Sequence, residues 1–488
     1  MHETAAGDRE TGLHTSWSPP LIGLVAVLVL VNFMVDTAIT APLIVLPQML
    51  DHFGTDHTAW LNASAMLAGA MWAPLLGKSA DVHGKRRVLV LTLLISCAGA
   101  LVCALAPNVW VFVAGRLLQG SAVAAMFLTV AIVRDVCAPR IAMLIVGIVT
   151  SGSGVLNIVS RFATEKLAAA HGFQILFVVS AIVAVTMALA VRGVVPESRI
   201  TTPGRIDFGG ALLMGSGLLG VLSYISLGSE LGWLALGPVA LLLGGAVALT
   251  RWSLVSSRKP EPLIDIRGLG LPLVLTLLVI VLATGSYQSL LQLIPLLTEV
   301  SGSQGLGYGL GGQGSLALLL AAPGIGVMLG GPLAGALAAR IGPAATLAGG
   351  VVVGTLGALG MFAGASMFPA AVVFAFLLGF TVGALGTSGF NMAGSLARPE
   401  QQGLVSSLVM VVVAIGSVVL NFVGSAVLRA TAVTVDGAAV NSGTGVFSYL
   451  AIAAGAFALA AVLALALARH VRRERNTPAH IQFERSHS

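Results

Sequence analysis

Long apolar runs alternate with short polar or Gly/Pro-containing breaks from one end of this chain to the other. Each run is near the ~20 residues that a helix needs to cross a bilayer. The pattern therefore predicts an all-α polytopic membrane protein with fourteen spans. The expected spans cover residues 21–48, 58–77, 87–106, 109–133, 140–164, 173–192, 207–228, 233–253, 271–299, 314–339, 344–364, 368–396, 403–429 and 445–469.

Composition supports a membrane location. Hydrophobic residues make up 57% of the 488 positions and charged residues only 9%, against about 25% charged in a typical soluble domain. So few charges could not cover a water-soluble protein of this size. The 60 glycines suit the close helix packing that is found in lipid. We expect a multi-pass protein of the plasma membrane that is surrounded by the lipid bilayer.

The positive charges predict the orientation of these spans. With the N-terminus inside, 21 of the 25 Lys and Arg fall in cytoplasmic segments, as the positive-inside rule requires. Both termini are therefore expected in the cytoplasm. The net charge of +6 then reflects membrane orientation, and no nucleic-acid partner is expected. The three cysteines show no disulfide or metal spacing, and no metal or other cofactor is expected.

The chain divides into two related six-span halves with an insert between them. "GKSADVHGKRR" (77–87) follows the second span, and "GPLAGALAARIG" (331–342) follows the equivalent span of the later half. Repeated halves of this kind are typical of secondary transporters. The expected segments are a tail at 1–20, a bundle at 21–192, linkers with two inserted helices (207–253) at 193–267, a bundle at 268–470 and a tail at 471–488.

Three motifs resemble those of the major facilitator superfamily, and more narrowly its fourteen-span drug/proton antiporter family. "GKSADVHGKRR" fits the superfamily's turn G-x-x-A-D-x-x-G-[RK]-[RK]-[RK]. "GRLLQG" (115–120) fits its fourth-span motif, and "VDTAITAPLIVLPQM" fits its first span, with an acid before the kink at Pro47. "RIDFGGALL", "GSELGW" and "EPLIDIRGL" are similar to the insert and linker of the fourteen-span group.

The resemblance implies a proton-driven exporter of small drug-like or metabolite compounds that works by alternating access, with no enzyme activity. One motif differs, because "GIVTSGSGVLNIVSRF" in the fifth span lacks the Pro and the Gly pair of the antiporter pattern. A proton-coupled or facilitative importer therefore stays open, as does a non-transporting membrane sensor. The expected partners are a small-molecule substrate, protons and lipid, and the expected state is a monomer.

The charged turn after the second span is a candidate conformational latch. Asp81 is placed to accept hydrogen bonds from a helix N-terminus or to pair with a cation; by resemblance it locks the turn to the later half. Asp135, at the end of span four, is expected to pair with Arg86 or Arg87. Alternatively, the cations simply hold the turn inside. The latch candidates are Gly77, Asp81, Gly84, Arg86, Arg87 and Asp135.

Two ionisable residues, Asp36 and Arg116, lie deep within the expected spans. Such groups cost ~2.5–3.5 kcal/mol each on insertion scales and are functional candidates. Asp36 lies about 18 Å from the outer end of span one, and Arg116 about 12 Å from the outer end of span four, at ~1.5 Å per residue. We interpret Asp36 as a proton carrier that Arg116 tunes, with a static ion pair as the alternative.

Polar residues inside the spans suggest a central substrate cavity. Each of them alone is as well explained by hydrogen bonds between helices. Glu299, near the outer end of its span, could attract a cationic substrate or be simply solvated. The cavity candidates are Asn32, Gln119, Asn157, Tyr287, Gln288, Gln292, Glu299 and Asn391.

Overall fold

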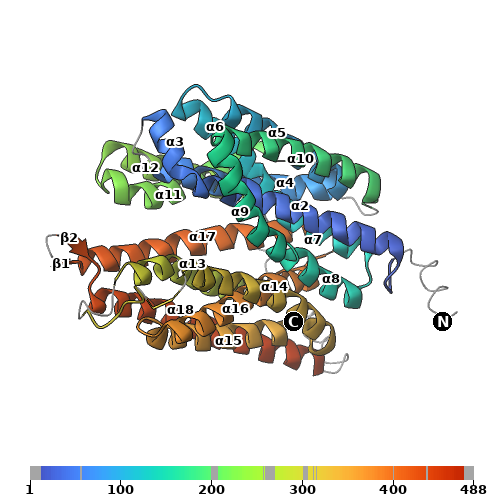
Figure 1. The fold of residues 1–488 in the computed structure, drawn as a ribbon. Coiled ribbons are helices and arrows are strands. Elements are labelled where there is room, and N and C mark those ends of the chain that lie inside the picture. The colour runs from blue at the N-terminus through green and yellow to red at the C-terminus, as the bar shows by residue number, and fades with distance from the viewer. Residues whose placement is uncertain are drawn as a thin grey trace.

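The computed structural model is almost entirely helical (Figure 1). It describes residues 13–54, 58–198, 207–256, 258, 270–300, 306–311, 313–314, 316–398, 401–435 and 438–476. Twelve helices in these ranges are long and apolar enough to cross a membrane. The helices over 58–77 and 140–164 are not among these twelve, so the expected number of fourteen spans stays a prediction.

The N-terminal half contains the first six expected spans. Its elements are α2 (Pro19–Ile44), α3 (Leu46–Phe53), α4 (Thr58–His83), α5 (Lys85–Ala104), α6 (Val109–Gln119), η1 (Gly120–Ala122), α7 (Val123–Val136), α8 (Pro139–Ser151), α9 (Gly154–His171) and α10 (Gln174–Val194). Span one is divided at Val45, next to Pro47 at the start of α3. Span five is divided between α8 and α9.

The insert and the C-terminal half follow. They contain α11 (Phe208–Leu231), α12 (Leu236–Ser256), α13 (Leu271–Glu299), α14 (Leu316–Ile341), α15 (Pro343–Gly364), α16 (Phe368–Leu396), α17 (Gln402–Ala430), β1 (Val433–Val435), β2 (Ala438–Val440) and α18 (Gly443–Asn476). The antiparallel hairpin β1–β2, in which Val433 pairs with Val440, was not expected from the sequence.

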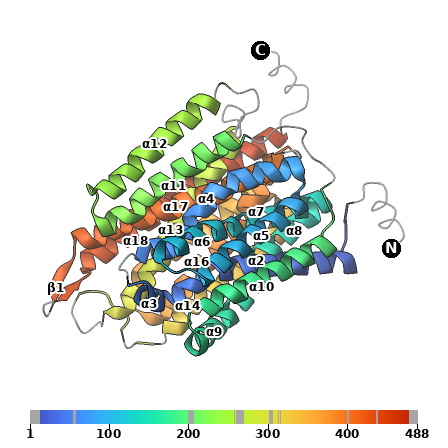
Figure 2. The ribbon, with the colours of Figure 1, turned by 90° about the horizontal axis from the view of Figure 1, so that it is seen from above.

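The two halves form two stacked layers. In Figure 1 the blue-to-teal helices of the first half lie above the yellow-to-red helices of the second. The halves meet where α4 packs on α17 and where α8 packs on α14 and α16. Helix α11 lies at the margin beside α4 and α17, and α12 packs on the outer side of α11, as Figure 2 shows.

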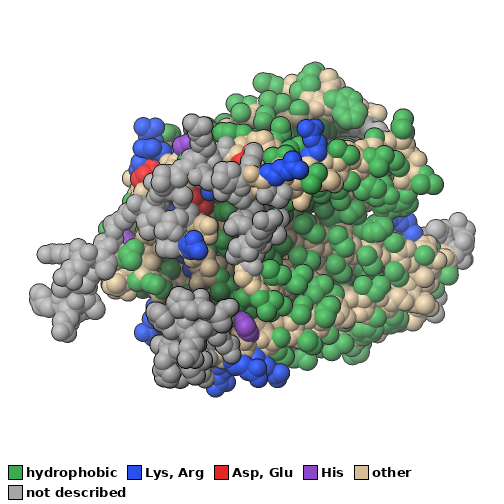
Figure 3. All heavy atoms as spheres, turned by 180° about the vertical axis from the view of Figure 1, so that it is seen from behind, with side chains coloured by type: hydrophobic (Ala, Val, Ile, Leu, Met, Phe, Trp, Pro, Cys, Tyr) green, Lys and Arg blue, Asp and Glu red, His purple; other side chains and the backbone are tan. Residues whose placement is uncertain are grey.

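Side-chain chemistry divides the surface as a bilayer requires. Figure 3 shows hydrophobic side chains over most of the visible face, while many of the visible Lys and Arg lie toward one side. That side is where α4, α7, α14, α16 and α18 end and where α5, α8, α15 and α17 begin. We call it the basic end. Its described cations include Lys78, Lys85, Arg86, Arg87, Arg134, Arg140, Arg340, Arg398, Arg469, Arg472 and Arg473.

Glycines bring α14 and α16 into backbone contact. Gly326 and Gly330 lie one turn apart on α14, and Gly379 and Gly383 do so on α16. A Cβ at any of these four positions would collide with the backbone of the other helix. Because lipid gives apolar helices no hydrophobic reason to associate, such close packing supplies the stability instead.

We expect Gly379→Ala and Gly383→Ala to lower stability by about 1–3 kcal/mol, because the added methyl group overpacks the seam. At Gly386, on the same helix, an added methyl group would meet no neighbouring atom within 4 Å. Gly386→Ala should therefore be neutral or stabilising, since Ala favours helix over Gly. Thermal unfolding of the three purified variants in detergent tests this; equal melting temperatures would contradict the packing argument.

Candidate functional site

Asp81 joins the two halves at the basic end. Its Oδ1 accepts a hydrogen bond from the backbone N–H of Gly403 at 2.9 Å, and its Oδ2 accepts one from Leu404 at 2.9 Å. These amides belong to the first turn of α17, where backbone N–H groups have no intrahelical partner. The carboxylate also meets the positive end of the helix dipole. This is the helix N-terminus contact that the sequence suggested.

The Asp81 carboxyl is almost completely enclosed, with 2% of the residue exposed. It lies beyond the apolar part of α4. Burial raises the pKa of Asp81 to about 6, although the hydrogen bonds from Leu404 and Gly403 act in the opposite direction. The group is thus mostly ionised at pH 7 and can accept both hydrogen bonds.

The two motif glycines have different roles. Gly77 lies within α4, which continues to His83, so it forms no turn. It instead permits close approach, because a Cβ there would collide with Ser407 and the carbonyl of Gly403. Gly84 does form the turn, with φ +95°, and a side chain there would also meet Glu197.

The expected pairing of Asp135 with Arg86 or Arg87 is wrong. Asp135 instead accepts hydrogen bonds from Lys85 Nζ at 2.8 and 2.9 Å, and the Lys85 side chain is only 1% exposed. Arg86 and Arg87 both pair with Glu197, each at 3.3 Å. The order of the three cations along α5 explains the difference, because only Lys85 points into the bundle. All these ion pairs lie within the N-terminal half.

A second connection between the halves involves Arg134 of α7. Its Nη2 donates to the carbonyl oxygens of Phe390 and Asn391, at 3.2 and 2.9 Å, and to Asn391 Oδ1 at 3.1 Å. Asn391 in turn donates to the carbonyl of Met143 on α8 at 3.2 Å. One side chain from each half thus reaches the backbone of the other, and both α7 and α16 also pack on α17.

Arg116 is fully buried and bonds to the backbone of α2. Its Nη1 donates to the carbonyl of Ala38 at 2.9 Å, and its Nη2 donates to that of Ile39 at 3.4 Å. The Ala38 carbonyl would normally accept from residue 42, but Pro42 has no N–H. Arg116 therefore satisfies an acceptor that the proline leaves free. Nη1 also donates to Gln119 Oε1 at 2.7 Å.

Three predicted site residues have side chains outside the described part of the structure, namely Asp36, Asn157 and Glu299. The backbone of Asp36 lies in α2, three residues before Ile39. Residues three apart lie on neighbouring parts of one helix face, so the Arg116 contacts fall within one turn of Asp36.

The remaining cavity candidates differ in accessibility. Asn32 is buried and donates to Thr129 Oγ1 and to the carbonyl of Val149, which joins α2, α7 and α8. Gln119 is buried and donates to Ser180 Oγ. With Asn391, these amides form the bridges between helices that the sequence left open as an alternative. On α13, Tyr287 is buried in the core, Gln288 is half-buried and Gln292 is exposed.

Sequence reasoning missed three site residues: Lys85 as a buried ion-pair partner, Arg134 as a link between halves, and Glu197. The adjacent pair Arg134-Asp135 at the end of an apolar run was a usable signal, since two opposite charges there need partners. Glu197 follows α10, far along the chain from the cations it contacts, and no local pattern connects them.

We expect Lys85→Met to lower the free energy of unfolding by about 3–5 kcal/mol, because Asp135 would lose its buried ion-pair partner. The double variant Lys85→Met/Asp135→Leu should recover most of this loss. Arg87→Met is the matched control; its side chain is 74% exposed, so we expect a change within about 1 kcal/mol. Chemical or thermal unfolding in detergent measures these effects; equal losses for Lys85→Met and Arg87→Met would refute the buried pair.

Comparisons with known proteins identify the family to which this sequence is similar. A family model described as Major Facilitator Superfamily matches residues 28–316 and 304–486. A uridine/deoxyuridine transporter of Lactococcus lactis subsp. cremoris (strain MG1363) is 30% identical over 351 residues, which are 68% of this chain and 71% of that protein. A multidrug resistance protein B homolog of Mycobacterium tuberculosis (strain ATCC 25618 / H37Rv) is 27% identical over 350 residues; the match covers 70% of this chain and 63% of that protein.

Solved structures show the same fold. The human organic anion transporter MFSD10 (TETRAN) matches with a TM-score of 0.63 and 19% identity, covering 92% of this chain and all of that one. The proton:xylose symporter XylE matches with a TM-score of 0.59 and 14% identity, over 90% and 94% of the two chains. From the family model and the Lactococcus relative, we conclude that the chain belongs to the Major Facilitator Superfamily of membrane transporters.

Proposed function

We propose that this chain is a proton-driven secondary active transporter that exports small drug-like or metabolite compounds by alternating access. One observation carries the proposal. Hydrogen bonds of Asp81 and Arg134, which water can replace when the halves separate, join the two halves at the basic end. We further propose a monomer in the plasma membrane, with fourteen spans and both termini in the cytoplasm.

The order of the helices supports the span number. Taking α2–α3, α6–α7 and α8–α9 as one crossing each gives fourteen crossings, an even number that returns the chain to its starting side. The basic end is then the cytoplasmic end. The pair α11–α12 crosses out and back, so both six-helix halves keep the same orientation.

Alternating access requires an interface that holds and then releases. The two hydrogen bonds to the Asp81 carboxylate are of the charged kind, which contribute about 1.5–3 kcal/mol each. When the halves separate, water can take over the same amides and the same carboxylate. Asp81 thus acts as a latch that closes the cytoplasmic side while the opposite side is open.

Proton coupling is proposed for Asp36 together with Arg116. A guanidinium close to an acid favours its ionised form, while desolvation favours its protonated form. Arg116, on α6, donates hydrogen bonds to two backbone carbonyls of α2 that lie within one turn of Asp36. One of these carbonyls has no intrahelical partner because Pro42 lacks an N–H. A change in the shape of α2 would move these carbonyls and therefore alter the field at Asp36.

A substrate path is proposed along α13. Gln288 and Gln292 lie one turn apart and are the accessible ones among the cavity candidates whose side chains the structure describes. Glu299 follows on the same helix and Asn157 lies on α9, so both are kept as candidates. The relatives transport chemically different compounds by their names, a nucleoside in one case and multiple drugs in another, so the substrate class is proposed only as small organic molecules.

Import is the second candidate function. The relative with 30% identity is named a uridine/deoxyuridine transporter, and the fifth span of this chain lacks the Pro and Gly pair of the antiporter pattern. The direction of substrate movement relative to protons separates the two candidates.

We expect Asp81→Asn to open the basic end, because an amide nitrogen would face one of the two α17 N–H donors. In a background without the native cysteines, Ser407→Cys reports this opening, since Ser407 is buried against Gly77. Maleimide labelling of this cysteine should become about tenfold faster or more, in line with the loss of a charged hydrogen bond. Asp51→Asn, at an exposed acid on α3, is the control and should leave labelling unchanged. The latch fails if both variants label like the parent protein.

We expect Asp36→Asn to abolish proton-coupled transport while the protein still folds. Reconstituted liposomes with an imposed pH gradient, loaded with lipophilic cations, neutral antibiotics or uridine, measure this. Substrate movement against the proton flow supports export, and movement along it supports import. Thr37→Val, a change at the neighbouring half-buried position, is the control. Full coupling in Asp36→Asn would rule out Asp36 as the proton carrier.

A further inference from the structure

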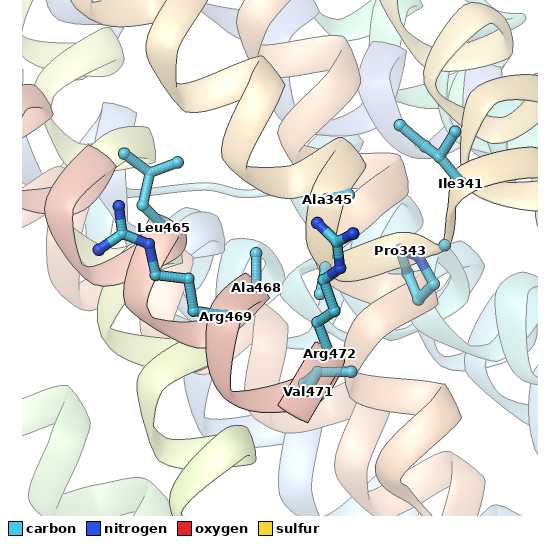
Figure 4. Close-up of a pocket in the computed structure, with 10 residues that line it drawn as sticks. Ile341, Pro343, Ala345, Leu465, Ala468, Arg469, Val471 and Arg472 are labelled. Carbon is cyan, nitrogen blue, oxygen red and sulfur yellow. The ribbon is translucent and has the colours of Figure 1, made fainter. Parts of the chain in front are cut away.

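A cavity of about 480 Å³ lies at the basic end, away from the interface between the halves. It is formed where α14 ends, α15 begins and α18 ends. Figure 4 shows Arg469 and Arg472 along one side of α18, with the Arg472 guanidinium close to Ala345. The lining residues are Ile341, Gly342, Pro343, Ala344, Ala345, Leu465, Ala468, Arg469, Val471 and Arg472.

The charge of this cavity is unbalanced. Among the residues that the structure describes, the lining contains two arginines and no acidic side chain. Both arginines are exposed, and neither forms an ion pair within the described residues. The first turn of α15 adds a partial positive charge, because its N-cap residue Gly342 offers no side-chain acceptor. Two guanidinium groups three residues apart on a helix can bind a phosphate group together.

Apolar stripes lead away from the cavity on both helices that form it. On α18 the exposed residues are Leu459, Val462 and Leu465, and on α15 they are Val352, Leu356 and Leu359. The two helices pack side by side. From Arg469 to Leu459 is ten residues, or ~15 Å of helix, which is about the depth of one leaflet of a ~30 Å hydrocarbon core.

We propose that this cavity binds the phosphate of an anionic phospholipid of the cytoplasmic leaflet, with its acyl chains along the two stripes. The orientation rests on the proposed function, in which the basic end is cytoplasmic. A soluble anion would use the arginines but not the stripes, whereas a phospholipid matches both. Basic pockets between spans on the cytoplasmic side are suited to such headgroups.

Native mass spectrometry of the full chain, released from nanodiscs that contain phosphatidylglycerol and phosphatidylcholine, tests the proposal. We expect retained phosphatidylglycerol in preference to phosphatidylcholine, and an approximately tenfold loss of its affinity in Arg469→Gln/Arg472→Gln. Arg473→Gln removes the same charge from the same helix outside the lining and should retain the lipid. Ala345→Glu, which places a negative charge in the cavity, should lose it as the double variant does.

Three results would overturn the proposal. Equal retention of both lipids would mean that the arginines do not distinguish the anionic phosphatidylglycerol from phosphatidylcholine. Equal losses in Arg473→Gln and in the double variant would mean that only net charge matters. Displacement of the lipid by millimolar inorganic phosphate would identify the site as one for a soluble anion. Because none of these readouts depends on transport, they are independent of whether Asp36 carries protons.

Discussion

Helix α17 begins with backbone amides that have no partner in their own helix, and the Asp81 carboxylate from the other half of the molecule accepts hydrogen bonds from two of them. In the proposed transport cycle, capping of α17 and closure of the basic end are therefore one event. Neither group can stay enclosed without the other, because buried unpaired polar groups are costly. Once the halves part, water can satisfy both. This exchange makes the contact specific when it is formed and still allows it to be released.

The rest of the interface consists of close helix packing and a few further polar contacts. Where α8 meets α14, a Cβ on Gly147 would collide with the backbone of Gly331, so the helices touch without large apolar side chains between them. In lipid such seams are held by close packing and polar contacts. Arg134 and Asn391 supply one polar contact, and the hydroxyls of Thr150 and Thr387, 3.1 Å apart, supply another. The ion pairs of Lys85, Arg86 and Arg87 stay within the first half, at the start of α5, the helix that follows the one carrying Asp81.

The sequence predicted the helices well because each apolar run is long and its ends contain Gly, Pro or charge. Asp81 could be predicted from its motif, since an acid between two glycines at a span end needs a partner. Its partner could not, because Gly403 and Leu404 are more than 300 residues away and offer only backbone. The predicted partner of Asp135 was wrong for a similar reason. The sequence offers three adjacent cations, and only the packing of the helices determines that Lys85 forms the ion pair. Arg116 is buried within a candidate span, but its contact with the carbonyl that Pro42 leaves free could not be derived from the sequence, since the two groups lie on different helices.

The most direct test of the account is the distance between the two halves at the basic end. Spin labels at His83→Cys on α4 and Arg398→Cys after α16 occupy exposed positions on opposite sides of the latch, and the three native cysteines are buried. Pulsed electron paramagnetic resonance in nanodiscs should give a dominant short distance in the labelled parent protein. A longer population should grow when Asp81→Asn is added. A single unchanged distance in both proteins would contradict the claim that the Asp81 contact with α17 controls opening of the cytoplasmic side.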